Sequence, residues 1–302
     1  MRRKASERRG VAGCDGMIVE KSLASLIERF ELDASLAEPR NLRGRFEAMD
    51  ALEVYLGDER GGGTALQQRA REFCAELEAR NLKLYEAIRG EIQRGAGGAA
   101  LREWMPDSNV AGHLRNTSGY DYLDELIGGV LRLEEPAAER AALESEMVAY
   151  QPTPARHIFD LIGRAALTER DLLIDLGSGL GQVTLVAAIC TKARCVGIEV
   201  EAGYVDCARK SARSLELKNA EFVEGDARTA DLSQGTVFYL YTPFTGAMLR
   251  DVLGLLRVEA GGREIRVGTY GPCTRVVAQE RWLRAVGAVD EDRVALFQSC
   301  HL

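Results

Sequence analysis

The sequence predicts an α/β fold, in which a Rossmann-like doubly wound sheet is preceded by an α-helical N-terminal domain. Before Tyr150 the apolar residues recur at helical spacing, and no stretch shows the alternation of a half-buried strand. After Tyr150, short runs rich in Val, Ile and Leu alternate with helical stretches, which is typical of a parallel sheet covered on both faces. The expected parts are a flexible basic tail at 1–17, a helical domain or cap at 18–149 and the sheet domain at 150–302.

The clearest helix of the first half begins after a glycine run. Thr64 is followed three residues later by Gln67, a capping box whose side chains satisfy backbone N–H groups at a helix start. The apolar face continues to about Arg94, and the glycine-rich stretch 95–98 ends it. The same periodicity predicts three further helices, at 18–31, 119–132 and 136–149.

The second half is expected to contain six strands and five helices in alternation. The expected strands are Leu172–Leu176, Cys195–Val200, Glu221–Val223, Val237–Tyr241, Ile265–Thr269 and Val294–Gln298. The expected helices are 154–166, 180–191, 202–215, 246–257 and 274–285. Because the strands are continuously apolar, we expect them to be buried between two layers of helices.

Composition and charge argue against several classes of protein. The 39 basic and 46 acidic residues give a net charge of −7, whereas nucleic-acid-binding domains are usually basic, so we do not expect a nucleic-acid partner. No apolar run approaches the roughly 18 residues of a membrane helix. No apolar segment follows the basic start, so we expect no secretory signal and a cytoplasmic location.

The seven cysteines and three histidines are scattered along the chain, and no C-x-x-C pair occurs. This spacing argues against a zinc site and against a disulfide framework. We therefore expect reduced, mostly buried thiols and no metal.

A glycine-rich turn after the first expected strand is the most informative motif. The strand ends at Asp175, and Gly177-Ser178-Gly179-Leu180-Gly181 then leads into a helix. Glycines allow positive φ and a close approach of a ligand to the backbone, and a helix start offers free N–H groups. In open α/β sheets the crevice at this edge of the sheet is the ligand site.

Acidic residues at two further strand ends indicate an adenosine ligand. The turn reads G-x-G-x-G, one residue shorter than the dinucleotide fingerprint, which disfavours an NAD-linked oxidoreductase. Glu199 ends the next strand and could accept hydrogen bonds from both ribose hydroxyls, although alone it would equally suit a solvated strand end. Asp226 and Ala227 follow the third strand, where a carboxylate could reach the adenine amine.

These motifs resemble those of the class I S-adenosylmethionine-dependent methyltransferases over about residues 150–270. The order D-L-G-S-G-L-G, then G-I-E, then E-G-D-A carries the resemblance. A closer likeness is to the non-SET histone-lysine methyltransferases, the disruptor-of-telomeric-silencing family. That family has Tyr-Gly-Glu-Thr where this chain has Tyr150-Gln151-Pro152-Thr153, and D-L-G-S-G-V-G-Q-V where residues 175–183 read D-L-G-S-G-L-G-Q-V.

The resemblance implies S-adenosyl-L-methionine as the cofactor. By it, Tyr150 and Thr153 would border the methionine end, Glu199 would hold the ribose and Asp226 the adenine. The expected cofactor-binding residues are Tyr150, Thr153, Asp175, Gly177, Ser178, Gly179, Gly181, Gln182, Glu199, Asp226 and Ala227.

The substrate-facing segments depart from that family. Its Asn-Asn-Phe after the fourth strand corresponds here to Tyr241-Thr242-Pro243-Phe244, and its Glu before the Thr is Pro152. We expect Tyr241 and Phe244 to form the catalytic pocket wall, with Tyr270 as another wall; the alternative is a proline turn with a packed aromatic. The departures leave the lysine substrate open.

The sequence thus predicts an S-adenosylmethionine-dependent methyltransferase. The predicted reaction is N-methylation, and a protein lysine is the first candidate for its acceptor. Methylation of a small metabolite or a nucleic-acid base is the alternative within the same enzyme class. A binding protein that senses the cofactor without turnover is the alternative from another class.

Overall fold

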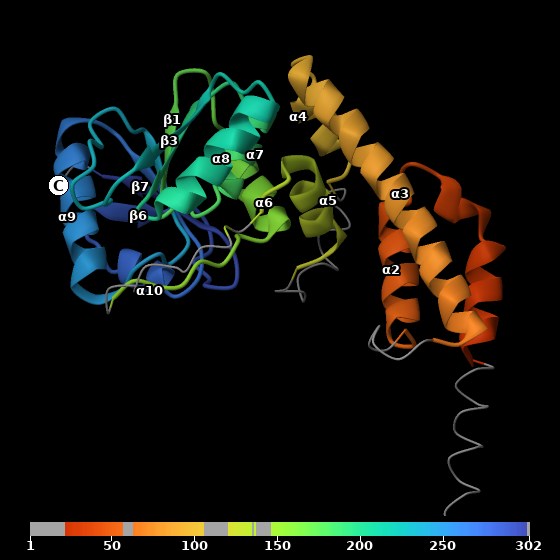
Figure 1. Ribbon diagram of the computed structural model, residues 1–302. Coiled ribbons are helices and arrows are strands. Elements are labelled where there is room, and N and C mark those ends of the chain that lie inside the picture. Colours follow the sequence, from red (N-terminus) through yellow and green to blue (C-terminus); the bar gives the residue numbers. More distant parts are fainter. Residues whose placement is uncertain (1–21, 57–62, 106–119, 135, 137–145, 301–302) are drawn as a thin grey trace, which may run out of the picture. The chain divides into compact units, whose positions relative to one another are not determined.

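The computed structural model describes residues 22–56, 63–105, 120–134, 136 and 146–300, and the expected basic tail lies outside them. The chain forms two compact units, Met1–Ala87 and Ile88–Leu302 (Figure 1). The unit that contains the sheet thus begins earlier in the chain than the expected sheet domain. The functional boundary between residues 149 and 150 stays a prediction.

The first unit is helical, as expected. A helix covers residues 22–31, and the other elements are η1 (Ala34–Ala37), α2 (Leu42–Glu53) and the first part of α3 (Ala65–Gln93). The capping box at the start of α3 is confirmed: Thr64 N donates to Gln67 Oε1 at 2.9 Å, and Gln67 N donates to Thr64 Oγ1 at 3.3 Å. The element α2 had no periodicity clear enough to be predicted.

A buried arginine connects α2 to α3 and to the segment before α2 in the first unit. Arg45 on α2 is 1% exposed. Its guanidinium donates to Asn81 Oδ1 on α3 at 2.5 Å and to the carbonyl oxygens of Glu38 at 2.6 Å and Pro39 at 3.1 Å. Burial lowers the pKa of Arg45, while these acceptors satisfy its donors. Three segments of the unit are thereby tied to one side chain.

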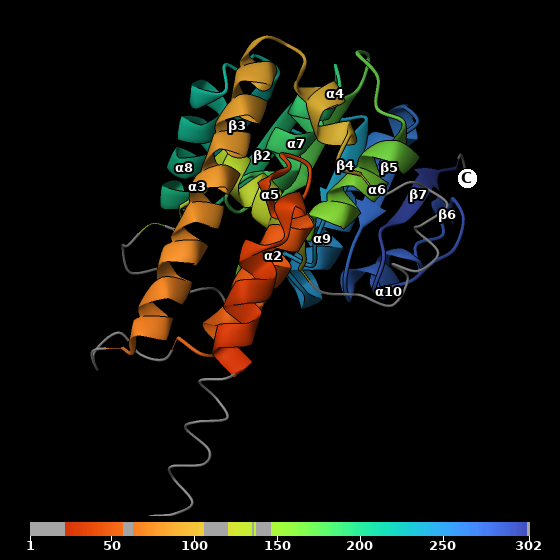
Figure 2. The same cartoon turned by 90° about the vertical axis from the view of Figure 1, so that its right-hand side faces the viewer.

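The second unit contains one seven-stranded sheet in the order β3-β2-β1-β4-β5-β7-β6. Figure 2 shows this sheet with β3 on one side of the view and β6 on the other. Strands β1 to β5 are parallel, whereas β7 runs antiparallel between β5 and β6. The bounds are β1 (Leu172–Leu176), β2 (Arg194–Glu199), β3 (Ala220–Glu224), β4 (Val237–Leu240), β5 (Arg266–Thr269), β6 (Leu283–Ala285) and β7 (Ala295–Ser299). The doubly wound sheet and all six expected strands are confirmed.

Helices cover both faces of this sheet. Helices α6 (Ala155–Ala165), α7 (Gln182–Cys190) and α8 (Ala202–Ser214) pack on one face (Figure 1). Helices α9 (Gly246–Gly262) and α10 (Cys273–Val277) pack on the other. The unit also contains α4 (Gly97–Arg102) and α5 (Tyr122–Leu131), and α5 confirms the helix expected at 119–132.

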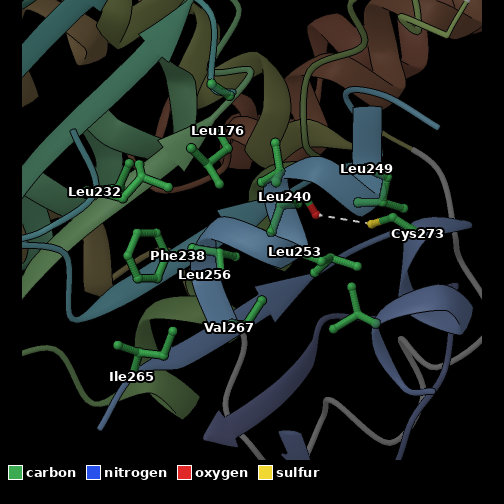
Figure 3. Close-up of a cluster of buried hydrophobic side chains, with 14 of the residues drawn as sticks. Leu176, Leu232, Phe238, Leu240, Leu249, Leu253, Leu256, Ile265, Val267 and Cys273 are labelled. Atoms are coloured by element: carbon green, nitrogen blue, oxygen red, sulfur yellow. Dashed lines mark hydrogen bonds between the residues drawn. The ribbon is translucent and has the colours of Figure 1, made fainter. Parts of the chain in front are cut away.

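The core on the α9 face explains why the strands are so apolar. Leu249, Leu253 and Leu256 of α9 meet Leu240 of β4 and its strand neighbours (Figure 3). The Cys273 thiol lies in the same cluster, with its sulfur 3.7 Å from the Leu240 carbonyl oxygen. Because β1 and β4 are fully buried, the side chains at their carboxyl ends are held rigidly, which suits a functional site.

The helix expected at 274–285 is wrong in its second half. Helix α10 ends at Val277, and Leu283–Ala285 form β6, which pairs with β7. The local sequence does not reveal β6 because its partner strand lies beyond the next loop. Residues 137–145 of the helix expected at 136–149 lie outside the described residues. The segment 146–149 is not helical and pairs instead with the chain after β4.

No helix within the described ranges is long and apolar enough to cross a membrane. Within the same ranges, no group of three or more His, Cys, Asp and Glu side chains is placed to hold a metal ion.

Candidate active site

A cavity of about 520 Å³ opens at the carboxyl ends of β1, β2 and β4. Its volume is in the range of small-molecule and cofactor sites. Among the predicted site residues, those that line it are Tyr150, Thr153, Asp175, Gly177, Ser178, Gln182, Glu199, Asp226, Ala227, Tyr241 and Phe244. Gly179 and Gly181 lie in the same turn but do not line the cavity.

The glycine turn needs its glycines for both conformation and space. Gly177, Gly179 and Gly181 have φ of 79°, 53° and 80°, in the left-handed region that favours glycine. A Cβ on Gly179 would lie 2.1 Å from a ring carbon of Tyr150, and one on Gly181 would lie 2.4 Å from a ring carbon of Phe222. The last two glycines therefore let aromatic rings pack against the turn.

Glu199 is fixed at the edge of the cavity by backbone donors. Its Oε2 accepts from Gly179 N at 2.8 Å, and its Oε1 accepts from Val200 N at 2.8 Å and Glu201 N at 3.0 Å. The side chain is 9% exposed. Because each carboxylate oxygen has two lone pairs, acceptor capacity remains for a ligand. The arrangement preorganises a negative charge at the end of β2.

Asp175 is the most buried acid of the site. It is 3% exposed, and Thr184 Oγ1 donates to its Oδ2 at 3.2 Å. Burial, followed by the nearby charge of Glu199, raises the pKa of Asp175 to about 7. A cationic ligand in the cavity would stabilise the ionised form of this carboxyl.

Ser178 and Gln182 bring further polar atoms to the cavity. Ser178 Oγ is buried and has no hydrogen-bond partner in the part of the chain that the structure describes. A buried hydroxyl in this state is expected to find a partner in a bound ligand or water. Gln182 Nε2 donates to the Thr153 carbonyl oxygen at 3.4 Å, and the Thr153 hydroxyl lies 3.1 Å from that of Tyr239.

Asp226 is less available than the sequence suggested. Its carboxylate accepts from the Arg228 backbone N–H at 2.7 Å and from Arg228 Nε at 2.8 Å. The side-chain hydrogen bond to Arg228 is the main reason that the pKa of Asp226 is lowered. The residue lines the cavity, but part of its acceptor capacity is already used. Its contact with adenine stays a prediction.

Aromatic rings build the other end of the cavity, where the sequence predicts the methyl acceptor, and we call it the acceptor end. The rings of Tyr241 and Tyr270 lie 4.6 Å apart between centroids, and the Tyr241 hydroxyl donates to Gln151 Oε1 at 3.3 Å. Burial raises the pKa of Tyr241 and raises that of Tyr270 to about 12, so both are neutral phenols. Glu291 and Asp292 also line the cavity.

The turn that follows Tyr241 has a rare backbone conformation. Thr242 has φ of 41°, a conformation that a β-branched residue rarely adopts. Its hydroxyl donates to the Tyr270 carbonyl oxygen at 3.1 Å and accepts from Cys273 N at 3.1 Å. Strained backbone of this kind collects at functional sites, where the surroundings hold it in place. Phe244 is 6% exposed and packs into the core as well as lining the cavity.

Several lining residues had no sequence signal. The sequence pattern around Tyr204 and Tyr239 is that of an ordinary helix and strand, and Glu291 and Asp292 belong to a loop without a motif. The buried imidazole of His157 lies 4.4 Å from the Tyr270 ring, and burial lowers its pKa to about 4. Only the folded chain brings the four lining residues to the cavity; His157 does not line it.

Comparisons with known proteins give two sequence matches. Residues 145–230 match the family model described as histone methylation protein DOT1. The chain is 36% identical over 163 residues to the 23S rRNA (uracil(1939)-C(5))-methyltransferase RlmD of Xylella fastidiosa, a match that covers 48% of this chain and 35% of that protein. The chain therefore spans about a third of the length of this curated relative.

Two solved structures are also similar. An RNA methyltransferase from Salinibacter ruber in complex with S-adenosyl-L-homocysteine is 28% identical with a TM-score of 0.40, covering 49% of this chain and 92% of that one. The putative methyltransferase yhhF from Escherichia coli is 18% identical with a TM-score of 0.40, covering 52% and 90%. At these TM-scores, neither likeness carries an inference about activity.

The family match and the curated relative support an enzyme that uses S-adenosylmethionine. The seven-stranded α/β sheet has the doubly wound arrangement that the sequence predicts. The second unit therefore has a Rossmann-like methyltransferase fold, and residues 145–230 within it are similar to the DOT1 family.

Proposed function

We propose that this protein is an S-adenosylmethionine-dependent methyltransferase that methylates a nitrogen atom, with a protein lysine as the first acceptor to test. The observation that supports it most is the cavity between the Gly177–Gly181 turn and the tyrosines of the acceptor end. One end, which we call the acidic end, presents Asp175, Glu199 and the backbone of the glycine turn, and the other presents the rings of Tyr241 and Tyr270. That division suits a cofactor and an acceptor that meet inside one site.

The acidic end fits the cofactor's charge. S-adenosylmethionine carries a sulfonium and an ammonium group, and Asp175 and Glu199 place two carboxyl groups at the same edge. Ser178 Oγ offers a buried hydroxyl that has no partner among the described residues. The bound cofactor would supply the activated methyl group. The role of the chain is to bind it, exclude water and aim the methyl at the acceptor end.

The acceptor end suits an amine. A free lysine amine titrates near about 10.4, so it arrives protonated and must lose its proton before it can attack. Desolvation between Tyr241 and Tyr270 would lower the pKa of the amine and favour the neutral form. Asp292 at the same end could hold the cation as it enters. The neutral phenols would then hold the amine in line with the sulfur–methyl bond and facing the methyl carbon, so that the N–C bond forms as the S–C bond breaks and S-adenosylhomocysteine leaves.

A nucleic-acid base is the second candidate, because the curated relative is an rRNA methyltransferase. Methylation at C5 of uracil needs a nucleophile that first activates the ring, and a thiolate is the usual choice. Within the described ranges no cysteine lines the cavity. Cys273 is buried behind the wall, and burial raises the pKa of its thiol. These observations favour a nitrogen over a pyrimidine carbon.

A transfer assay with radiolabelled S-adenosylmethionine tests the proposal against three acceptor pools: lysine-rich proteins, total RNA and small amines. We expect label in the protein pool, with loss of transfer in Tyr241→Ala and retention in Tyr241→Phe, which keeps the ring. Label in RNA alone would replace the lysine proposal by the second candidate. Cofactor binding without transfer to any pool would identify a sensor instead of an enzyme.

A further inference from the structure

Helix α9 begins at the acceptor end of the cavity, and its own sequence does not cap it. Thr245 occupies the N-cap position, but its side chain makes no capping hydrogen bond. The first backbone N–H groups of a helix have no partner within the helix and need an acceptor from elsewhere. Water or another part of the chain must therefore supply an acceptor.

Glu146 supplies this acceptor from the segment that precedes α6. Its Oε2 accepts from Met248 N at 2.8 Å, and its backbone carbonyl accepts from Thr245 N at 2.8 Å. The N–H groups of Ala247 and Met248 hold the pKa of Glu146 below its usual range. A Cβ on Gly246, whose φ is 56°, would lie 2.1 Å from Glu146 Oε1. The carboxylate therefore occupies the space beside the helix start, where its charge also complements the helix dipole.

The two segments stay paired beyond this contact. Met147 and Phe244 form an isolated antiparallel bridge, and Val148 N donates to the Pro243 carbonyl oxygen at 3.1 Å. Both segments line the cavity. Among the described residues, this pairing extends from Glu146 to Val148.

Each segment carries a wall of the site. Tyr150 follows Glu146 by four residues and lies against Gly179 of the glycine turn, on the side expected to hold the cofactor. Tyr241 precedes α9 and stands at the acceptor end. We propose that Glu146 is a positioning residue. By capping α9 from the segment before α6, it holds Tyr150 and Tyr241 in place on the two sides of the cavity. The proposal rests on the proposed function only for the identity of the ligand.

Hydrogen–deuterium exchange and binding of S-adenosylhomocysteine to the full chain test this role. In Glu146→Ala we expect exchange at Ala247 and Met248 to rise about ten-fold, while the central strands keep their protection. The dissociation constant for S-adenosylhomocysteine should rise about three-fold or more. Glu146→Gln keeps one acceptor oxygen without the charge, so it should rescue part of both effects.

The control is Glu264→Gln, because Glu264 is an exposed acid in the loop before β5 and does not line the cavity. It should change neither measurement. Unchanged exchange in Glu146→Ala, or unchanged affinity despite faster exchange, would overturn the proposal. If the Ala variant does not fold, Glu146→Gln should still show a smaller rise in exchange and in the dissociation constant, and no change in either would overturn the proposal. If wild-type protein does not bind S-adenosylhomocysteine, the proposed function fails, and the exchange measurement alone decides whether Glu146 holds the two segments.

Discussion

We predict that replacing the buried carboxyl of Asp175 raises the stability of the ligand-free protein and lowers its affinity for the cofactor. Burial, with the nearby Glu199 charge, raises the pKa of this carboxyl from 3.8 to about 7. The folded protein therefore holds this proton more tightly than the unfolded chain does. As the pH rises from about 4 to about 7, the unfolded chain ionises first, and the contribution of Asp175 to stability is lost.

Asp175→Asn removes this titration while an amide oxygen can still accept from Thr184. A shift of about three pH units corresponds to roughly 4 kcal/mol at pH 8, since one unit is about 1.36 kcal/mol. We therefore expect the ligand-free variant to be more stable than wild type at pH 8, by up to about 4 kcal/mol. The difference should become small near pH 4. The same variant should bind S-adenosylmethionine more weakly, because it loses a carboxylate that suits a cation.

Urea unfolding at pH 4.5 and pH 8, with calorimetric titration of the cofactor, measures both effects. Asp171→Asn is the matched control. Desolvation opposes ionisation there, but hydrogen bonds from Thr168 and Thr236 and the charge of Arg266 outweigh it, so its pKa is lowered. That variant should lose stability at pH 8, and the loss should diminish as the pH falls. If Asp175→Asn is no more stable than wild type at pH 8, burial does not disfavour the ionised form of the Asp175 carboxyl.

Three further predictions concern the walls of the site. Glu199→Ala should weaken S-adenosylhomocysteine binding about ten-fold or more by calorimetry, because charge-assisted hydrogen bonds contribute roughly 1.5–3 kcal/mol; an unchanged constant would place the ribose elsewhere. Gly179→Val should abolish binding, because its Cβ would lie 2.1 Å from the Tyr150 ring at a φ of 53°; normal binding would show that the turn can relax. Tyr241→Ala should keep cofactor affinity and lose transfer, whereas Phe244→Ala should also lower the melting temperature, because Phe244 packs in the core; loss of cofactor affinity in Tyr241→Ala would place that ring in the cofactor pocket.

Local motifs were sufficient to predict much of this molecule. Thr64 and Gln67 predict a helix start that depends only on neighbouring residues, and the structure confirms it. The strand that ends at Asp175, with the glycine turn after it, is likewise encoded in one continuous stretch. These features could be predicted because burial, turn geometry and capping act over a few residues.

Other features depend on partners that are distant in sequence. The strand Leu283–Ala285 exists because β7 pairs with it, and its local pattern resembles a helix end. The Glu146 carboxylate caps α9 by accepting from Met248 N, 102 residues away in sequence, so no motif reveals it. Asp226 is different, because its partner Arg228 is only two residues away, but no motif indicated that the Arg228 side chain would bind this carboxylate. The ligand assignments of the site residues therefore stay predictions.

Calorimetric titration of wild-type protein with S-adenosylmethionine, S-adenosylhomocysteine and NAD tests the central claim most directly. The shortened glycine turn and the cavity acids predict saturable binding of both sulfur ligands. They also predict no heat with NAD, because the G-x-G-x-G turn is one residue shorter than the dinucleotide fingerprint. Binding of NAD with no response to either sulfur ligand would contradict the account.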